Sequence, residues 1–441
     1  MQKQGCKKEI SLSPQDDDSI CKTKTRSLLI KEGLFGGLSI NLTNQFITPY
    51  ALSLQTSPTQ IGIMSSLLGV IPPLGQIAGS NLMKQKSRRS IIIKSVFLQT
   101  LMIPLIMLLG FFTIFSWSSL ILPIFLICFY ILYSFFGSVP NPSYFSLMGD
   151  VVPEDRRGRY YSKRNILITA LSIAVSVLAS ILLDEFDRVN QVLIGFFIIF
   201  SITLISRSIC IFIFRKFYYP PFIIEQESYV KLKNFIKQIP NNNFGLFTLF
   251  ITFTFFSVYI GAPFVGVYML KVLDFSYIEY VVVSMSTPLI GLLFTPLLGH
   301  LSDKYGNAVI LKICGLMLPT VPILWIVMNN PVPLILGPQL MSSVAWTGVN
   351  LAAFNFIYDN VPTQQRGFFV AYYSLFQGMG VLFGGLLGSI LLGIVPIIFL
   401  SVYETLFLIS GICRLLVDIA FLFRLKEVRI NNNNKHRSME F

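Results

Sequence analysis

Long apolar stretches alternate with short polar gaps along the whole chain, and this pattern predicts membrane-spanning helices. A helix needs about 20 mostly apolar residues to cross a bilayer. The predicted spans cover residues 29–53, 60–82, 91–114, 118–148, 165–184, 190–214, 245–270, 278–300, 308–328, 333–357, 367–392 and 398–423. The longest polar gap, at 215–244, separates them into two sets of six. The pattern therefore predicts an all-α membrane protein with twelve transmembrane helices in two six-helix bundles.

The predicted domain organisation follows from these spans. Both tails are polar and are expected to be disordered, and the first lacks the apolar core of a secretory signal peptide. The expected parts are an N-terminal tail (1–27), a first bundle (28–214), a central loop (215–244), a second bundle (245–424) and a basic C-terminal tail (425–441).

Composition supports a membrane protein and disfavours other classes. Hydrophobic residues make up 54% of the 441 positions and charged residues 12%, against about 25% charged in an average soluble domain. Six scattered cysteines and two histidines give no metal-site or disulfide pattern. Sequence motifs of soluble enzymes are missing, so we expect neither an enzyme nor a cofactor or metal.

The net charge of +13 would fit a nucleic-acid-binding protein only if the basic residues shared one water-exposed face. Instead, nearly all of the 34 lysines and arginines lie in the tails and in alternate loops between spans, and only Arg188 and Lys271 lie in the other loops. Cytoplasmic loops retain positive charge. The sequence therefore predicts no nucleic-acid partner, a multi-pass protein of the plasma membrane (the cell inner membrane), and two cytoplasmic termini.

An internal repeat relates the two bundles. The segment NPSYFSLMGDVVPEDRRG (141–158) aligns without gaps with NLAAFNFIYDNVPTQQRG (350–367), and FITPYAL (46–52) resembles FVGVYML (264–270). Such parallel repeats form a cavity where the halves meet, near the bilayer midplane. Each copy of the longer motif has an aspartate, a helix-ending proline and an arginine. The aspartate can pair with its own arginine or reach the other half, and a structural or gating role is favoured for Asp150, Pro153, Arg157, Asp359, Pro362 and Arg366.

The loop GHLSDKYGNAVIL (299–311) carries a family resemblance. It is similar to the signature G-x-L-a-D-r-x-G-r-k-x-x-l of the major facilitator superfamily, with Asn307 and Ala308 in place of the usual basic pair. The corresponding first-half loop has Met83 where the aspartate belongs and Lys86 where the second glycine belongs. The resemblance implies a transporter that works by alternating access, with a gating role for Gly299, Asp303, Lys304 and Gly306. We expect Gly299 to permit close helix approach and Gly306 a tight turn; alternatively, the loop only turns the chain.

Polar residues inside a bilayer are costly and tend to be functional. In the first span, Asn41, Asn44, Gln45 and Thr48 follow i, i+3, i+4, i+7 spacing, so they share one helix face that we expect to look into the cavity. Each of these side chains can instead form a hydrogen bond with a neighbouring helix. Further cavity candidates are Asn141, Tyr144, Tyr259, Tyr268, Asn350 and Gln377. A glycine cluster at 378–388 is expected to permit close packing.

Three charged residues fall within predicted spans. Arg414 and Asp418, four residues apart, can neutralise each other. Arg207 has no acid in its own helix, so it either extends to the interface or meets an anionic substrate or a carboxylate such as Asp150. The cavity helices carry no acid or histidine near their midplanes, since Glu32 lies at the inner end of the first span. Proton antiport is therefore disfavoured, and the coupling ion stays open.

The function predicted from these features is secondary active transport of a small neutral or amphiphilic solute. The expected partners are this small molecule, the lipid bilayer and a possible coupling ion, and the protein is expected to be a monomer. Two alternatives remain: a facilitative uniporter or lipid-related transporter of the same fold, and a membrane sensor that transports nothing.

Overall fold

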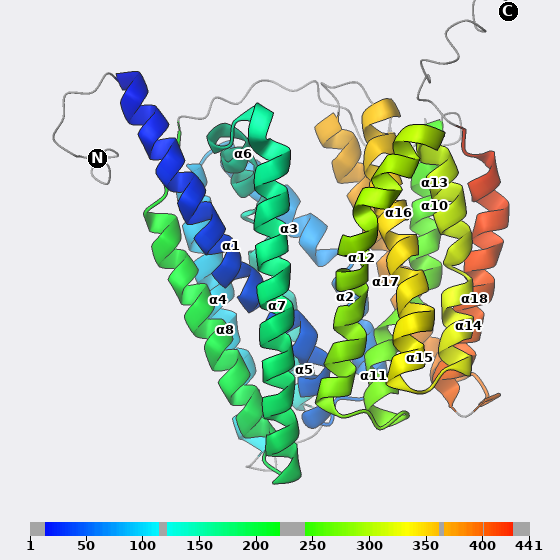
Figure 1. Cartoon of the computed structure of the whole chain (residues 1–441). Coiled ribbons are helices and arrows are strands. Elements are labelled where there is room, and N and C mark those ends of the chain that lie inside the picture. Colours follow the sequence, from blue (N-terminus) through cyan, green and yellow to red (C-terminus); the bar gives the residue numbers. More distant parts are fainter. Residues whose placement is uncertain (1–13, 114–120, 221–242, 361–365, 400, 427–441) are drawn as a thin grey trace, which may run out of the picture. The chain divides into compact units, whose positions relative to one another are not determined.

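The computed structural model describes residues 14–113, 121–220, 243–360, 366–399 and 401–426, which are helical apart from short connections (Figure 1). The chain divides into two compact units. Unit 1 contains Met1–Thr56 and Ile71–Glu225, and unit 2 contains Ser57–Val70 and Gln226–Phe441. The segment 57–70, expected in the first bundle, therefore clusters with the second half of the chain.

Unit 1 is a bundle in which the long first helix packs between two later ones. Its elements are α1 (Pro14–Ser53), α3 (Ile71–Met83), α4 (Arg88–Phe112), α5 (Ile121–Ser138), α6 (Asn141–Val151), η2 (Glu154–Arg156), α7 (Arg157–Arg188) and α8 (Val192–Arg215). The helix α1 packs against α7 and α8, and α4 packs against α5 and α8 (Figure 1). The N-termini of α4 and α7 and the C-terminus of α8 form one end of unit 1, which we call its basic end.

The first helix is longer than expected. Because α1 begins at Pro14, residues 14–27 continue the helix, and the prediction of a disordered tail up to residue 27 is wrong for this part. With 40 residues at 1.5 Å each, α1 is about 60 Å long, well beyond the bilayer core of about 30 Å.

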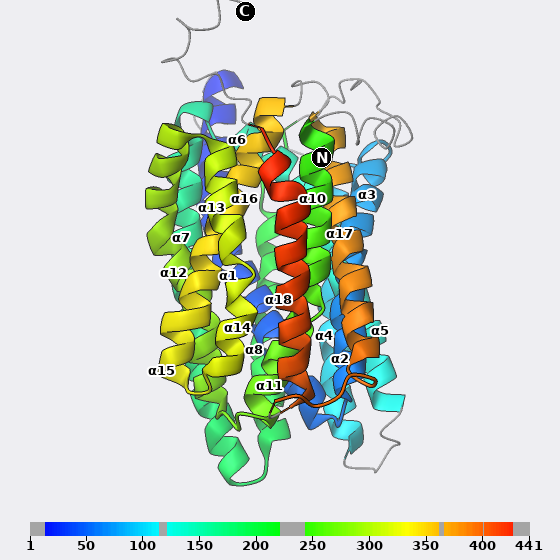
Figure 2. The same cartoon turned by 90° about the vertical axis from the view of Figure 1, so that its right-hand side faces the viewer.

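Unit 2 contains one helix from early in the chain and the helices of the second half. Its elements are α2 (Pro58–Leu67), α10 (Asn243–Tyr259), η4 (Ala262–Phe264), α11 (Val265–Lys271), α12 (Tyr277–Tyr305), α13 (Asn307–Met317), α14 (Thr320–Val327), α15 (Pro331–Leu334), η5 (Ile335–Gln339), α16 (Leu340–Asn360), α17 (Arg366–Leu391), α18 (Val402–Phe421) and η7 (Leu422–Arg424). Figure 2 shows α10 beside α17 and α18, with which it packs.

Five predicted spans are interrupted. The spans expected at 60–82, 118–148, 245–270, 308–328 and 333–357 each appear as two or more helical segments. Three of the interruptions contain a proline, namely Pro140, Pro263 and Pro319. Proline lacks the N–H donor that an uninterrupted helix needs, so the helix breaks there. Apolar periodicity alone does not locate such breaks.

Each unit has its own apolar core. In unit 1 the side chains of Leu29, Ile92, Leu147 and Phe214 are buried together near the basic end. In unit 2 the corresponding cluster contains Phe244, Phe247, Phe250, Leu311 and Leu422.

The glycines of α17 allow two close helix contacts, as the sequence predicted. A Cβ added to Gly380, Gly384 or Gly388 would lie 2.1–2.2 Å from a backbone carbonyl oxygen of the α10 segment or the residue after it. On another face, a Cβ on Gly385 would lie 2.2 Å from Ser66 Oγ of α2. Small residues therefore bring both helices against α17.

Ten helical segments among the described residues are long and apolar enough to cross a membrane. The first predicted span, within α1, and the tenth, within α15–α16, are not among these ten. The protein is thus a multi-pass membrane protein, and the count of twelve spans stays a prediction.

Candidate functional site

The polar face of α1 is engaged by neighbouring helices of unit 1. Asn41 Nδ2 donates to Ser172 Oγ of α7 at 3.0 Å, and the Tyr130 hydroxyl of α5 donates to Asn44 Oδ1 at 3.0 Å. Gln45 is buried and Thr48 is half-buried. The amides thus position α1 against α5 and α7.

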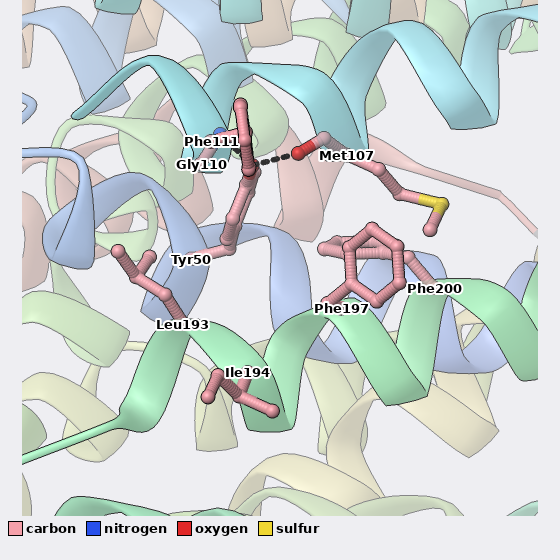
Figure 3. Close-up of a pocket in the computed structure, with 8 residues that line it drawn as sticks. All are labelled: Tyr50, Met107, Gly110, Phe111, Leu193, Ile194, Phe197 and Phe200. Atoms are coloured by element: carbon pink, nitrogen blue, oxygen red, sulfur yellow. Dashed lines mark hydrogen bonds between the residues drawn. The ribbon is translucent and has the colours of Figure 1, made fainter. Parts of the chain in front are cut away.

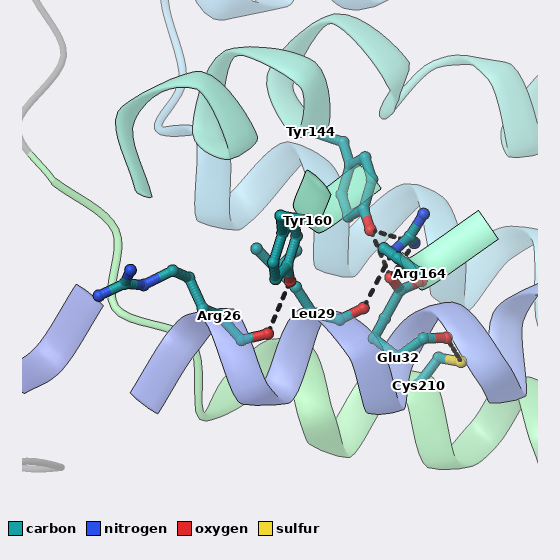
Figure 4. A network of polar contacts seen from close by, with 7 residues as sticks. All are labelled: Arg26, Leu29, Glu32, Tyr144, Tyr160, Arg164 and Cys210. Carbon is teal, nitrogen blue, oxygen red and sulfur yellow. Dashed lines mark hydrogen bonds and ion pairs between the residues drawn. The ribbon is translucent and has the colours of Figure 1, made fainter. Parts of the chain in front are cut away.

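A charged cluster lies closer to the basic end, on α1, α6 and α7 (Figure 4). The Tyr144 hydroxyl donates to Glu32 Oε2 at 2.6 Å and accepts from Arg164 Nη2 at 2.7 Å. Arg164 Nη2 also lies 3.4 Å from Glu32 Oε2, and its Nε donates to the Leu29 carbonyl at 3.2 Å. We call Glu32, Tyr144 and Arg164 the Glu32 cluster.

A second arginine approaches α1 one turn further along the helix, at Gly36. Arg207 of α8 is 4% exposed and its Nη2 donates to Gln99 Oε1 of α4. A Cβ added to Gly36 would lie 2.8 Å from Glu32 Oε1 and 3.2 Å from Arg207 Nη1. Glycine at this position therefore lets the carboxylate and the second guanidinium flank the α1 backbone.

These contacts bear on the sequence-based alternatives for Arg207. The side chain is buried and bonds Gln99, so it does not extend to an exposed interface. Asp150 pairs with Arg88 instead, and contact of Arg207 with an anionic substrate stays a prediction.

A buried charge in an apolar bundle is tolerated when it is paired and hydrogen-bonded. Glu32 and Arg164 supply such partners to each other, and Gln99 supplies one to Arg207. The first set of bonds joins α1, α6 and α7, and the second joins α4 to α8.

The basic end is closed by an arginine that the sequence analysis did not single out as a site residue. Arg88, the first residue of α4, is 4% exposed. Its Nη1 donates to Asp150 Oδ2 at 2.6 Å and Ser146 Oγ at 3.0 Å, and its Nη2 donates to the Pro220 carbonyl at 2.7 Å. Asp150 thus pairs with Arg88, an alternative that the repeat motif alone did not suggest.

The rest of the first repeat motif caps α6. Arg157 donates from Nε to the Val152 carbonyl at 3.2 Å and from Nη2 to the Gly149 carbonyl at 2.7 Å. The helix ends at Val151, two residues before Pro153, as predicted.

Beyond α8, burial raises the pKa of Tyr219, so its hydroxyl stays a donor to the Phe214 carbonyl (3.0 Å).

The signature loop of unit 2 joins α12 to α13. Gly306 has φ of 93°, a conformation that glycine adopts without strain, and this confirms the predicted tight turn. Asp303 and Lys304 are exposed. A Cβ added to Gly299 would meet no atom of the described residues within 4 Å, so close helix approach at Gly299 stays a prediction.

The residue after this turn makes a contact like that of Arg88, although the signature alignment pairs Asn307 with Ser87. Asn307 is the first residue of α13, and its Oδ1 accepts from Ser302 Oγ at 2.5 Å and from Asn355 Nδ2 at 3.0 Å. Asn355 aligns with Ser146 in the internal repeat. The two units therefore join equivalent helix ends, one through a charge and one through an amide.

The remaining cavity candidates lie in varied surroundings. Asn141 and Gln377 are half-buried and Asn350 is exposed. The Tyr259 ring stacks on Phe255 with centroids 6.3 Å apart. Pro362 and the side chains of Asp359 and Arg366 lie outside the described residues.

Tyr268 and the charges of α18 form two buried sites in unit 2. Tyr268 is fully buried, and its hydroxyl donates to Glu404 Oε1 at 2.8 Å. Arg414 Nη1 donates to the Leu318 carbonyl at 3.0 Å, while Asp418 Oδ2 has no hydrogen-bond partner. No salt bridge within 4.0 Å joins these two described residues, but their opposite charges still interact across one helical turn, in line with the predicted mutual neutralisation.

Comparison with known proteins places the chain in a family. The sequence model of the Major Facilitator Superfamily matches residues 33–378, and the chain belongs to this family. It is therefore a transporter and not an enzyme. Among curated protein sequences, none matches the chain.

Solved structures agree on the fold. The chain is similar to a mutant of the nucleoside transporter NupG, with 14% identity, a TM-score of 0.70, and 90% of this chain and 100% of that chain covered. It is also similar to a bacterial homologue of the iron transporter ferroportin in the inward-facing state, with 17% identity, a TM-score of 0.71, and 91% of this chain and 98% of that chain covered. A third similar structure is a POT family transporter in complex with a thioalcohol-conjugated peptide. It has 13% identity and a TM-score of 0.66, and the match covers 91% of this chain and 96% of that chain.

Proposed function

We propose that this transporter moves a small neutral or amphiphilic solute by alternating access, as a secondary active transporter. The observation that carries the proposal is the internal pairing of charge in unit 1. Glu32 is bonded to Tyr144 and Arg164, Arg207 to Gln99, and Asp150 to Arg88. Charged side chains that already satisfy one another are poor ligands for an ionic solute, because binding would have to replace those bonds.

The polar face of α1 is the proposed solute contact. Amide side chains offer both donors and acceptors, so they suit a neutral polar solute. Asn41 and Asn44 each have an identified partner and retain further hydrogen-bonding capacity. Among the similar structures, one is titled a nucleoside transporter, another an iron transporter homologue, and another a complex with a peptide. Nucleosides are the neutral class among these, so they are the first solutes to try.

The gating role proposed for the signature loop concerns Asp303 and Lys304, together with the Arg88–Asp150 pair at the basic end of unit 1. An exposed aspartate beside helix ends can stabilise one access state by accepting hydrogen bonds from helix N-termini. Asp303→Asn is expected to shift the access equilibrium. Unchanged transport and unchanged reactivity of cysteines introduced at the cytoplasmic side would contradict this role.

The proposed setting is the plasma membrane, with both termini in the cytoplasm and a monomeric protein. Coupling to protons is not part of the proposal, since the acid of α1 is bonded to Tyr144 and Arg164. Facilitated diffusion, or lipid-related transport by the same fold, would show as movement that persists after ion gradients are dissipated.

A thermal-shift screen of the purified protein tests the proposal, because a bound solute stabilises the folded state by mass action. The library contains nucleosides, other neutral polar solutes, amphiphiles and charged controls. A neutral or amphiphilic compound is expected to raise the unfolding temperature of the wild type more than that of Asn41→Ala, with Asn330→Ala as the exposed-amide control. Stabilisation by charged compounds only would contradict the proposal, and no stabilisation across the panel would favour the sensor alternative.

A further inference from the structure

An apolar groove lies at the end of unit 1 opposite its basic end, between α1, α4 and α8 (Figure 3). Its volume is about 290 Å³, and its lining residues are Tyr50, Met107, Gly110, Phe111, Leu193, Ile194, Phe197 and Phe200. All eight belong to unit 1. The groove is distinct from the polar face of α1 and from the Glu32 cluster.

The one side-chain hydroxyl in this lining is already bonded. The Tyr50 hydroxyl donates to the Ile106 carbonyl at 2.7 Å and accepts from the Gly110 amide at 2.8 Å. An uninterrupted α-helix joins this carbonyl and this amide to each other, so Tyr50 inserts into the hydrogen-bond ladder of α4. Figure 3 shows its ring reaching α4 beside Met107 and Gly110. The surface offered to a ligand is therefore almost entirely hydrocarbon, with the Met107 thioether as an adaptable wall.

The rim of the groove belongs to the lipid-facing surface. Phe111 is 56% exposed, Phe197 54% and Ile194 47%, and all three lie in segments long and apolar enough to cross the membrane. An exposed apolar side chain on a membrane-crossing segment is expected to meet the hydrocarbon of the bilayer. The groove is thus continuous with the lipid interface of α4 and α8.

Unit 2 fills the equivalent place with its own side chain. Tyr268 aligns with Tyr50 in the internal repeat. The Phe407 ring packs edge-on against Tyr268 with centroids 5.3 Å apart. In the same way, the Phe200 ring packs edge-on against Tyr50 at 5.0 Å. In unit 2 the indole of Trp325 packs against both Tyr268 and Phe407, at 6.3 and 6.4 Å.

The corresponding helix of unit 1 places small or flexible groups beside Tyr50. There α4 contributes Met107, Gly110 and Phe111 to the lining, and a Cβ on Gly110 would lie 2.9 Å from the Tyr50 hydroxyl. Phe111 is 56% exposed and lies at the rim, so the space beside Gly110 and Met107 can take a hydrocarbon ligand.

We propose that this groove binds one acyl chain of a bilayer phospholipid. The chain enters between the Phe111 and Phe197 rings and lies against Leu193 and Met107. Burial of each methylene contributes about 0.8 kcal/mol when it leaves water, but a lipid chain moves here from hydrocarbon to protein, so its retention depends on packing against the rings and the thioether.

Photolabelling of the full chain in vesicles tests this binding. The probe is a phosphatidylcholine with a diazirine on one acyl chain, and labelled peptides are identified by mass spectrometry. We expect label to concentrate on segments 107–111 and 193–200. The variant Ile194→Trp places an indole at the rim, and Phe212→Trp places the same ring at a 61% exposed site of the same helix.

Labelling of the groove is expected to fall about tenfold in Ile194→Trp, the factor that corresponds to 1.4 kcal/mol, and to stay unchanged in Phe212→Trp. A second readout, native mass spectrometry of the detergent-purified protein, should show one retained phospholipid in the wild type and in Phe212→Trp but none in Ile194→Trp. Uniform labelling of all lipid-facing helices, or equal labelling and retention in the three proteins, would overturn the proposal. Transport is not a readout here, so failure of the proposed solute transport would leave this result unaffected.

Discussion

Glu32 in unit 1 and Phe250 in unit 2 are counterparts in the internal repeat, because each lies 18 residues before its aligned tyrosine. Arg164 and Tyr373 are also counterparts, each six residues after the aligned glycine of the longer motif. In unit 1 Arg164 bonds the Leu29 carbonyl and approaches Glu32. In unit 2 Tyr373 stacks on Phe247, the counterpart of Leu29, with centroids 5.7 Å apart and an angle of 1°.

The same helix contact is therefore held by an ion pair in one unit and by an aromatic stack in the other. Replacing a buried ion pair with well-packed apolar residues is often neutral for stability, whereas removing one charge leaves the other unpaired. The charged version restricts geometry more tightly, since its bonds have fixed directions. The two halves of the repeat therefore share the same helix–helix contact, but charged side chains form it in unit 1 and aromatic side chains form it in unit 2.

The largest expected effect comes from breaking the charged version. Glu32→Leu leaves Arg164 and Arg207 without the nearby carboxylate, and we expect a loss of about 3–5 kcal/mol of unfolding free energy. The matched variant Phe250→Leu removes no charge and should cost about 1 kcal/mol. Thermal unfolding of both variants in detergent checks this, and similar losses in the two units would contradict the comparison.

A smaller effect is expected at the helix ends. Arg88→Ala removes the charge-assisted bonds to Asp150 and the Pro220 carbonyl, at a cost of about 2 kcal/mol, because Asp150 is partly exposed and its charge is screened. Asn307→Ala, which removes the corresponding contact of unit 2, loses neutral bonds and should cost about 1 kcal/mol. The difference in unfolding midpoint between Arg88→Ala and the wild type should be smaller at high salt than at low salt. The corresponding difference for Asn307→Ala should not depend on salt. A salt-independent Arg88→Ala would argue against the ion pair.

Removing both charges together sharpens the comparison further. Glu32→Phe and Arg164→Tyr introduce the residues that unit 2 has at the two aligned positions. The double variant should be about 1 kcal/mol more stable than the sum of the two single effects predicts, because neither charge is left unpaired. A double-mutant cycle of unfolding free energies measures this coupling. Strict additivity would show that the two positions do not act as one contact.

The smallest expected effect distinguishes the two buried tyrosines. Tyr50→Phe frees the Ile106 carbonyl and the Gly110 amide to bond each other, so we expect a loss of about 0.5 kcal/mol. Tyr268→Phe removes a donor from the buried Glu404 carboxylate, with a loss of about 1–2 kcal/mol. Unfolding midpoints measured side by side check the order, and a larger loss for Tyr50→Phe would reverse our interpretation.

Much of the architecture could be predicted from the sequence because a bilayer imposes a simple length requirement on apolar segments. The span ends near Met83, Arg215 and Asn243, the turn at Gly306 and the close packing of α17 all follow from local sequence rules. The interruptions of five spans do not, since apolar periodicity continues through a break and proline tolerates several helix positions. The helical extension of α1 to Pro14 was missed because its residues are polar.

The candidate site was predicted less well, because side-chain partners are set by tertiary packing. Tyr144 was chosen as a cavity residue, but its hydroxyl bonds Glu32. Arg88 and Arg164 belong to no motif that the sequence analysis used, because their partners lie on other helices. One sequence signal could have found the Glu32 cluster: the glycines at 33 and 36, next to a lone acid, leave room for guanidinium groups against α1.

Solute counterflow with purified protein in vesicles is the most direct test of transport. Vesicles are loaded with an excess of the unlabelled compound that stabilises the protein most, and entry of the labelled compound is followed without any ion gradient. We predict a transient accumulation inside the vesicles that is reduced in Asn41→Ala and unchanged in Asn330→Ala. Stable binding of the compound with no counterflow in correctly folded protein would contradict the conclusion that this chain moves its solute.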